Sequence, residues 1–196
     1  MRVAIIKYNA GNIYSVDYAL RRIGITPVIT DDRAVLQSAD KVIFPGQGEA
    51  RHTMEYLRKY DLDSLIKGLK QPVLGICIGM QLMCAHSEEG DTECLGIFDA
   101  SVVKFERQHK GEKIPHMGWN SIYNLKTPLF PPKLEDEYVY FVHSYYVPCN
   151  DYSIADCNYI QPFCAAMRQD NFYATQFHPE KSGSVGECIL RHFIEL

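Results

Sequence analysis

Apolar runs alternate with amphipathic segments through the first half of the chain, and this pattern predicts buried strands separated by helices. Strands are expected at 2–8, 26–30, 41–46 and 71–77. Helices are expected at 11–24, with Asn12 as the candidate N-cap, at 50–70, and at 79–86. Continuously apolar strands between helices are typical of a parallel sheet covered on both faces, so we expect an α/β fold.

The second half has a different pattern, in which short strand-like runs are separated by turns from 97 to 177. A proline-rich, charged connector at 125–137 is too short to link two domains. Near the end, Val185, Ile189 and Phe193 recur about every fourth residue and predict a final amphipathic helix. We therefore expect residues 1–196 to form one α/β domain with a mostly parallel central sheet and a β-rich second half folded back onto it.

The composition is that of a soluble globular protein, with 46% apolar and 22% charged residues among 196. A net charge of −4 and the lack of a basic stripe argue against nucleic-acid binding. The apolar run before Lys7 is too short for a signal peptide, and no stretch approaches the roughly 18 apolar residues of a membrane span, so we expect a cytoplasmic protein. The seven cysteines lack zinc-site spacing, and in a reducing compartment most are expected to be small apolar core residues.

One cysteine has an unusual setting, in "GICIG" at 75–79, where a predicted strand turns into a helix. This is the pattern of a nucleophile elbow, in which Gly75 and Gly79 would relieve the crowding of a sharp turn. The helix N-terminus would favour the thiolate of Cys77, and the N–H of Ile78 would face a developing oxyanion. By itself the motif fits an incidental cysteine at a strand–glycine turn equally well.

A second motif, "TQFHPEKSG" at 175–183, places His178 and Glu180 two residues apart around Pro179. We expect Pro179 to keep this segment extended, so that both side chains project to the same side. The carboxylate could then orient the imidazole toward a thiol, which would make Cys77, His178 and Glu180 nucleophile, base and orienting acid. Alone, the same residues could be an ordinary surface loop.

A third motif, "FPGQGEA" at 44–50, ends another predicted parallel strand. Neighbouring strand ends in an open α/β sheet line the same crevice. A glycine-flanked peptide could therefore offer a second oxyanion N–H, from Gln47. An ordinary tight turn would explain the motif as well.

Taken together, "GICIGMQ", "ATQFHPEKSG", "PGQG" and "PHMGWN" resemble the class I glutamine amidotransferases over nearly the whole chain. "PHMGWN" (115–120), "HPEKS" and the early "GN" narrow the resemblance to the glutaminase subunits of imidazole glycerol phosphate synthase in histidine biosynthesis. The resemblance implies a flavodoxin-like single domain, 1–196, that hydrolyses glutamine to glutamate and ammonia through a Cys77 thioester. It implies no cofactor and no metal.

The resemblance also implies which residues hold glutamine. They are Gly48, Gln81, Glu89, Ser144 and Tyr145, the last two through their backbone. For Glu89, a solvated acid at a helix end is the alternative. His143 is interpreted as structural, since the match of His178 to the catalytic histidine is stronger. Where the family commonly has an apolar residue, this chain has Gln47; because a backbone N–H needs no particular side chain, we expect the chemistry to survive.

The family docks on a (β/α)8-barrel cyclase, to which ammonia passes for the synthesis of imidazole glycerol phosphate and AICAR from the phosphoribulosyl-formimino intermediate. The resemblance implies a heterodimer whose interface includes Asn12, Trp119, Tyr140 and Lys181, although Trp119 could instead be a core residue. Three other functions remain open from the sequence. They are a glutaminase supplying another synthase, such as a sugar-modifying one, a free-standing γ-glutamyl hydrolase, and a non-catalytic cysteine sensor of similar fold.

Overall fold

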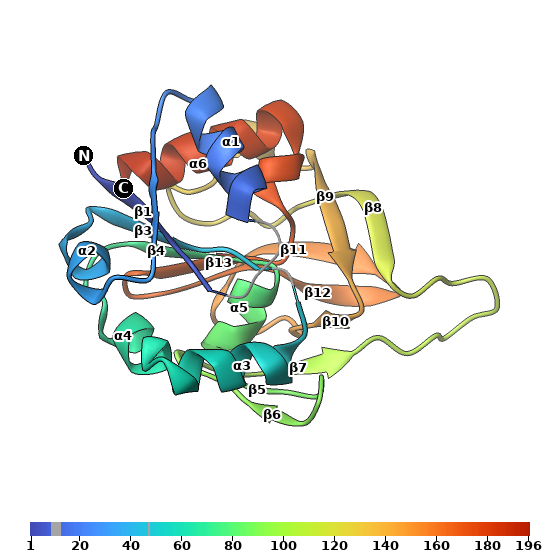
Figure 1. The fold of residues 1–196 in the computed structure, drawn as a ribbon. Helices are drawn as coiled ribbons and strands as arrows, with labels where there is room; N and C mark the ends of the chain where they lie inside the picture. The colour runs from blue at the N-terminus through green and yellow to red at the C-terminus, as the bar shows by residue number, and fades with distance from the viewer. Residues whose placement is uncertain (9–12, 47) are drawn as a thin grey trace.

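The computed structural model describes residues 1–8, 13–46 and 48–196, and a seven-stranded sheet runs through its middle (Figure 1). The strand order is β11-β12-β13-β4-β3-β1-β2. The parallel strands are β1 (Val3–Ile6), β2 (Val28–Thr30), β3 (Lys41–Phe44), β4 (Val73–Ile76) and β13 (Phe172–Thr175). The antiparallel strands β11 (Ser153–Tyr159) and β12 (Gln161–Gln169) extend one edge. The predicted mostly parallel sheet is confirmed.

Helices cover both faces of this sheet, and the strands divide their side chains between two cores. Val3 and Ile5 pack in the core under α1 (Ile13–Arg22) and α6 (Gly183–Glu195). Ala4 and Ile6 pack in the core on the other face. The helices of that second face are α2 (Arg33–Ser38), α3 (Ala50–Lys59), α4 (Leu62–Gly68) and α5 (Ile78–Met83). Successive strand residues point to opposite faces, so apolar residues at consecutive positions supply both cores.

Two smaller sheets lie beside the carboxyl ends of the parallel strands, and most of their strands come from the second half of the chain, which confirms its β-rich character. One has the order β10-β7-β5-β6 and consists of β5 (Cys84–Ser87), β6 (Thr92–Glu93), β7 (Phe98–Lys104) and β10 (Tyr145–Tyr146). The other is an antiparallel ribbon of β8 (His116–Ser121) and β9 (Tyr138–His143). Two short 3-10 turns, η1 (Pro132–Leu134) and η2 (Pro179–Lys181), complete the elements. The segment between β7 and β8 projects away from the body of the molecule (Figure 1).

Two predicted helices differ from the structure. The helix expected at 50–70 is two helices, because Asp61 adopts a left-handed conformation (φ 53°) between α3 and α4. The helix expected at 79–86 ends at Met83, because the next residues, Cys84–Ser87, pair with β7 and β6 instead. Cys84 is fully buried as expected, but on a strand. The predicted N-cap Asn12 lies outside the described residues.

No helix in the ranges 1–8, 13–46 and 48–196 is long and apolar enough to cross a membrane.

Candidate active site

The strand-to-helix turn predicted at "GICIG" is present, with Cys77 between β4 and α5. Cys77 has φ 53° and ψ −108°, a backbone conformation that side-chain-bearing residues rarely adopt. Its N–H donates to the carbonyl of Thr175 on β13 at 2.7 Å, which fixes the nucleophile against the neighbouring strand. Ile78 begins α5, where backbone N–H groups have no partner within the helix. This is the geometry of a nucleophile elbow.

The two glycines of the elbow are required by close backbone approach. A Cβ on Gly75 would lie 2.9 Å from Sδ of Met83 and 3.0 Å from the carbonyl carbon of Gly79. A Cβ on Gly79 would overlap the carbonyl oxygen of Phe44, at the end of β3. The elbow is therefore packed directly against the strand that precedes the "PGQG" motif.

His178 and Glu180 form a buried pair at the end of β13. His178 Nδ1 lies 2.7 Å from Glu180 Oε1, and the two side chains are 3% and 0% exposed. His178 itself is extended, but Pro179–Lys181 form the 3-10 turn η2, so the expectation of a segment extended through Glu180 is wrong. Proline is well suited to the first position of such a turn, and the Ser182 hydroxyl donates to the His178 carbonyl at 2.7 Å to close it. The predicted pairing survives the changed backbone.

The electrostatics of His178 favour its protonated form. Burial by itself would lower the pKa of His178, but the nearby Cys77 sulfur and the Glu180 carboxylate raise it to about 10. Because Nδ1 faces Glu180, the buried second ring nitrogen, Nε2, is the one left to interact with the Cys77 sulfur. The surroundings of His178 therefore favour the imidazolium, the form that can donate a proton to a leaving group.

A cavity of about 310 Å³ opens beside Cys77 and His178. Its wall brings together all five residues predicted to hold substrate and the predicted oxyanion donor Ile78, which come from separate elements of both halves of the chain. These are Gly48, Ile78, Gln81, Glu89, Ser144 and Tyr145. His143 and Lys181 also line the cavity, as do Gly46, Pro115 and Val142.

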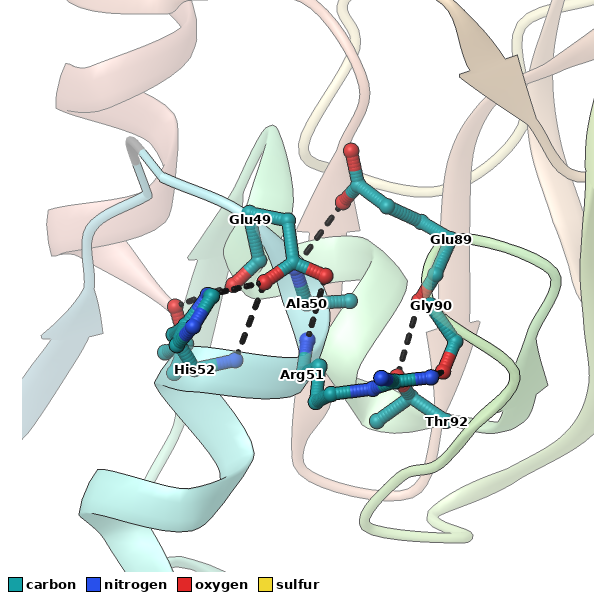
Figure 2. A network of polar contacts seen from close by, with 8 residues as sticks. Glu49, Ala50, Arg51, His52, Glu89, Gly90 and Thr92 are labelled. Atoms are coloured by element: carbon teal, nitrogen blue, oxygen red, sulfur yellow. Dashed lines mark hydrogen bonds and ion pairs between the residues drawn. The ribbon is translucent and has the colours of Figure 1, made fainter.

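Glu89 reaches this cavity from the turn that follows β5, and it is not at a helix end, so that alternative is wrong. Figure 2 shows its carboxylate directed at the start of α3, where Oε2 accepts from the N–H of Ala50 at 2.9 Å. Burial raises the pKa of Glu89, the Ala50 N–H opposes this, and the Glu49 carboxylate adds to the rise. Arg51 Nε donates to the Gly90 carbonyl at 2.8 Å and ties the turn to the helix (Figure 2). A half-buried carboxylate with one hydrogen bond can accept a further cationic partner.

Gln47, the predicted source of the second oxyanion N–H, lies outside the described residues. The residues on either side of it, Gly46 and Gly48, both line the cavity. The Tyr8 hydroxyl donates to the carbonyl of Pro45 and holds the beginning of this segment. Tyr8 is buried, and burial together with Cys77 raises the pKa of its phenol. The sequence did not point to Tyr8, because nothing local links the end of β1 to the end of β3.

The predicted interface residues lie around the ribbon of β8 and β9. Trp119 is 55% exposed, so it is not a core residue. It pairs with Tyr140 across the ribbon, with ring centroids 6.1 Å apart. The Tyr140 carbonyl accepts from the His178 N–H at 2.9 Å, and Lys181 lies on η2 at the cavity wall. Asn12 is outside the described residues. Further exposed aromatic and apolar side chains that the sequence did not single out are Tyr14, Tyr18, Met117 and Tyr138.

Within the described ranges, no three histidine, cysteine or acidic side chains are placed to hold a metal ion. All seven cysteines are free thiols. Cys94, Cys157 and Cys164 are buried, and burial raises the pKa of each to about 12. Cys77 is the cysteine that lies at a cavity beside a histidine–carboxylate pair.

Comparisons with known proteins agree with this geometry. The family model "Glutamine amidotransferase class-I" matches residues 4–196. The chain is 61% identical to "Imidazole glycerol phosphate synthase subunit HisH" of Bacteroides fragilis (strain YCH46) over 196 residues, which is 100% of each chain. It is 44% identical to the HisH subunit of Escherichia coli (strain K12), again with 100% of each covered.

Solved structures share the fold at low sequence identity. A crystal structure of a glutamine amidotransferase superposes with a TM-score of 0.75 at 19% identity, covering 100% of this chain and 98% of that one. The PurLQS structure from Thermotoga maritima gives a TM-score of 0.71 at 16% identity, covering 99% and 97%. These likenesses confirm the fold and say nothing further about the reaction.

Proposed function

The chain belongs to the class I glutamine amidotransferases and, within them, to the HisH subunits of imidazole glycerol phosphate synthase, and from this we propose the reaction it carries out. It is a glutaminase subunit that releases ammonia from glutamine for a cyclase subunit in histidine biosynthesis. The observation that carries the proposal is the buried His178–Glu180 pair beside the strained Cys77 at the cavity. We further propose that residues 1–196 form one glutamine amidotransferase domain and act in the cytoplasm.

The chemistry follows from the geometry of the three side chains. The Cys77 thiolate attacks the side-chain amide carbon of glutamine and forms a tetrahedral intermediate. The N–H of Ile78, and that of Gln47, would stabilise its oxyanion. The His178 imidazolium gives its proton to the leaving nitrogen, and ammonia departs from a thioester. Neutral His178 then takes a proton from water, which attacks the thioester and releases glutamate, while Glu180 holds the ring through Nδ1.

The cavity wall suggests how glutamine is oriented. The Glu89 carboxylate is proposed to take the α-ammonium group, since it is half-buried and, among the residues that the structure describes, accepts one hydrogen bond, from the Ala50 N–H. The other proposed contacts come from Gly48, Gln81 and the backbone of Ser144 and Tyr145. A cation held at Glu89 would lower the energy of its partly desolvated negative charge.

The proposed partner is the (β/α)8-barrel cyclase subunit, which would use the ammonia to make imidazole glycerol phosphate and AICAR. The β8–β9 ribbon is its proposed docking face, with Trp119, Tyr140, Lys181 and Asn12. An aromatic side chain that is more than half exposed is typical of a protein interface. The backbone bond from His178 to Tyr140 connects this face to the active site.

Glutaminase activity should be measured with and without the cyclase subunit and a nucleotide ligand of the cyclase. We expect a slow reaction from the free subunit and a severalfold or larger acceleration in the complex. Cys77→Ala should abolish glutamine-dependent synthesis, whereas ammonium salt should still support it through the cyclase. Cys149→Ala, at an exposed cysteine, is the matched control and should behave as wild type. A glutamine-dependent rate retained by Cys77→Ala would refute the assignment of the nucleophile.

A further inference from the structure

A chain of hydrogen-bonded polar groups, buried at His116, His143, Gln81 and Gln176, runs from the β8–β9 ribbon to the sulfur of Cys77. The catalytic scheme leaves four of its side chains without a role, those of Asn120, His116, His143 and Gln176. Gln81 and the Tyr145 backbone are also proposed glutamine contacts, and the Tyr145 carbonyl lies in the middle of the chain. Its members, in order, are Asn120, His116, His143, the Tyr145 carbonyl, Gln81, Gln176 and Cys77. The donors and acceptors along this polar chain can be assigned one by one, starting from the carbonyl.

The Tyr145 carbonyl fixes the state of His143. His143 Nδ1 lies 2.7 Å from this oxygen, and a carbonyl only accepts, so Nδ1 carries the hydrogen. Burial lowers the pKa of His143 to about 3, so the ring is neutral and its Nε2 has a lone pair. The tautomer of His143 is therefore determined by its neighbours.

The acceptor nitrogen of His143 in turn fixes the tautomer of His116. His116 Nδ1 lies 3.0 Å from His143 Nε2, which must accept, so His116 also carries its hydrogen on Nδ1. Burial lowers the pKa of His116 to about 4, which leaves its Nε2 as an acceptor. Asn120 Nδ2 faces that nitrogen at 3.4 Å and donates to the Asn158 carbonyl at 3.0 Å, while Asn120 Oδ1 accepts from the Ser121 N–H. Each hydrogen bond that links one member of this half to the next is therefore donated in the direction of Tyr145.

The other half leads from Tyr145 to the nucleophile. The Tyr145 carbonyl accepts a second bond, from Gln81 Nε2 at 3.0 Å. The same nitrogen donates to Gln176 Oε1 at 2.9 Å, and Gln176 Nε2 is then directed at Cys77 Sγ, 3.9 Å away. Gln81 and Gln176 are 4% and 0% exposed, so their amide orientations are set by these partners and not by solvent.

We propose that His116 and His143 are positioning residues of the glutaminase site. As neutral rings with the hydrogen on Nδ1, they orient the Tyr145 carbonyl. Through Gln81 and Gln176, this carbonyl in turn orients the surroundings of the Cys77 sulfur. Their effect on turnover rests on the proposed function, whereas the assignment of their tautomers rests on the hydrogen bonds alone. The polar chain begins on β8, the strand that also carries the exposed Trp119. It therefore gives the proposed docking face a hydrogen-bonded connection to the nucleophile.

The alternative is that His116 serves only as a flat ring in an aromatic stack. Its ring lies 4.0 Å from that of Tyr159 and 4.7 Å from that of Phe141, at small interplanar angles. The hydrogen-bonding role and the stacking role predict opposite effects for two substitutions of His116. His116→Phe keeps a stacking ring and removes the donor to His143, while His116→Asn keeps a donor at the Nδ1 position and removes the ring.

The two variants should be compared for glutamine kcat/KM in the complex with the cyclase subunit. We expect His116→Asn to stay within about threefold of wild type and His116→Phe to lose about tenfold, the effect of one buried group left without its hydrogen bond. The reverse order, or equal values for the two variants, would overturn the proposal. If His116→Phe does not fold, His143→Asn and His143→Phe give the same comparison at the next link.

The tautomers can be read without any activity, by 15N-correlated NMR of the histidine rings in the unmodified protein at neutral pH. We expect both His116 and His143 to be neutral and protonated at Nδ1. A proton on Nε2 of either ring would overturn the proposal even if the protein is an active glutaminase. Conversely, Nδ1–H rings in a protein without glutaminase activity would reject the proposed function and leave the polar chain in place.

Discussion

The exchange Glu180→Gln tests how strongly the buried carboxylate controls His178. The glutamine amide oxygen can still accept from His178 Nδ1, so the orientation of the ring is kept while the negative charge is removed. In the native protein these groups are 2.7 Å apart and almost completely buried, so solvent screens them little. The change therefore isolates the electrostatic role of Glu180.

The magnitude follows from the kind of bond that is lost. A hydrogen bond to a charged group contributes about 1.5–3 kcal/mol, against about 0.5–1.5 kcal/mol for a neutral one. The difference is on the order of 1–2 kcal/mol, and about 1.36 kcal/mol corresponds to one unit of pKa. The pKa of His178, raised to about 10 in the native protein, is thus expected to fall to roughly 9 in the variant. A comparable loss in the transition state would reduce kcat about 5- to 30-fold.

The assay is the pH dependence of glutamine kcat/KM for the complex with the cyclase subunit. His178 must be protonated to release ammonia, so activity should fall as the pH rises through its pKa. The alkaline limb should lie near pH 10 in the native enzyme and move to lower pH in Glu180→Gln, because removing the carboxylate favours the neutral ring. An unmoved limb together with kcat within threefold of wild type would refute the reasoning.

Asp91→Asn is the matched control. Asp91 Oδ1 lies 2.9 Å from His86 Nε2, but both side chains are open to solvent, with Asp91 92% and His86 40% exposed. Exposed ion pairs contribute little, and asparagine tolerates the left-handed backbone at this position (φ 47°). We expect Asp91→Asn to leave kcat and the pH profile unchanged.

Three further predictions concern the elbow, the thiols and the docking face. Gly79→Ala should lower the free energy of unfolding by several kcal/mol in urea titrations, because its Cβ would overlap the Phe44 carbonyl. Gly68→Ala, at the end of α4 with open space around it, should be neutral or stabilising, and equal effects of the two changes would contradict the packing of the elbow. Iodoacetamide at pH 8 should alkylate Cys77 faster than the more exposed Cys149. Partial desolvation and the neighbouring Asp156 raise the pKa of Cys149 to about 11, so that roughly one in a thousand of its thiols is ionised at this pH; faster modification of Cys149 in peptide mass spectra would argue against Cys77 as the activated nucleophile. Trp119→Ala should leave the melting temperature nearly unchanged and weaken cyclase binding by tenfold or more in calorimetry. Tyr60→Ala, which removes a similarly exposed aromatic ring just after α3, should bind the cyclase normally, and an unchanged affinity of Trp119→Ala would exclude Trp119 from the interface.

The parts of the site that the sequence predicted are those set by local chain geometry. Gly75, Gly79 and the strand before them mark the elbow because a sharp turn needs residues without side chains. His178 and Glu180 pair across Pro179 because they are two residues apart, and this proximity holds in the 3-10 turn as it would in a strand. The apolar runs of β1, β3 and β4 are recognisable because both faces of these strands are buried.

The parts that were missed depend on contacts between distant segments. Tyr8 reaches Pro45 only once β1 and β3 are paired, and His116 meets His143 only through the register of β8 and β9. The segment after Met83 has the composition of a helix, yet pairing with β7 and β6 makes it a strand, which is tertiary context overriding local preference. At Asp61, a single left-handed residue divides an otherwise continuous helical pattern.

The position of β13 has a consequence for the order in which the protein is made. This strand, residues 172–175, lies between β12 and β4 in the interior of the sheet, and its Thr175 carbonyl holds the N–H of Cys77. During synthesis from the N-terminus, Cys77 leaves the ribosome long before the strand and the histidine that complete its setting. A nascent or truncated chain therefore contains the nucleophile without its catalytic machinery. Glutamine hydrolysis is therefore expected of the finished fold alone, and an incomplete subunit is expected to release no ammonia.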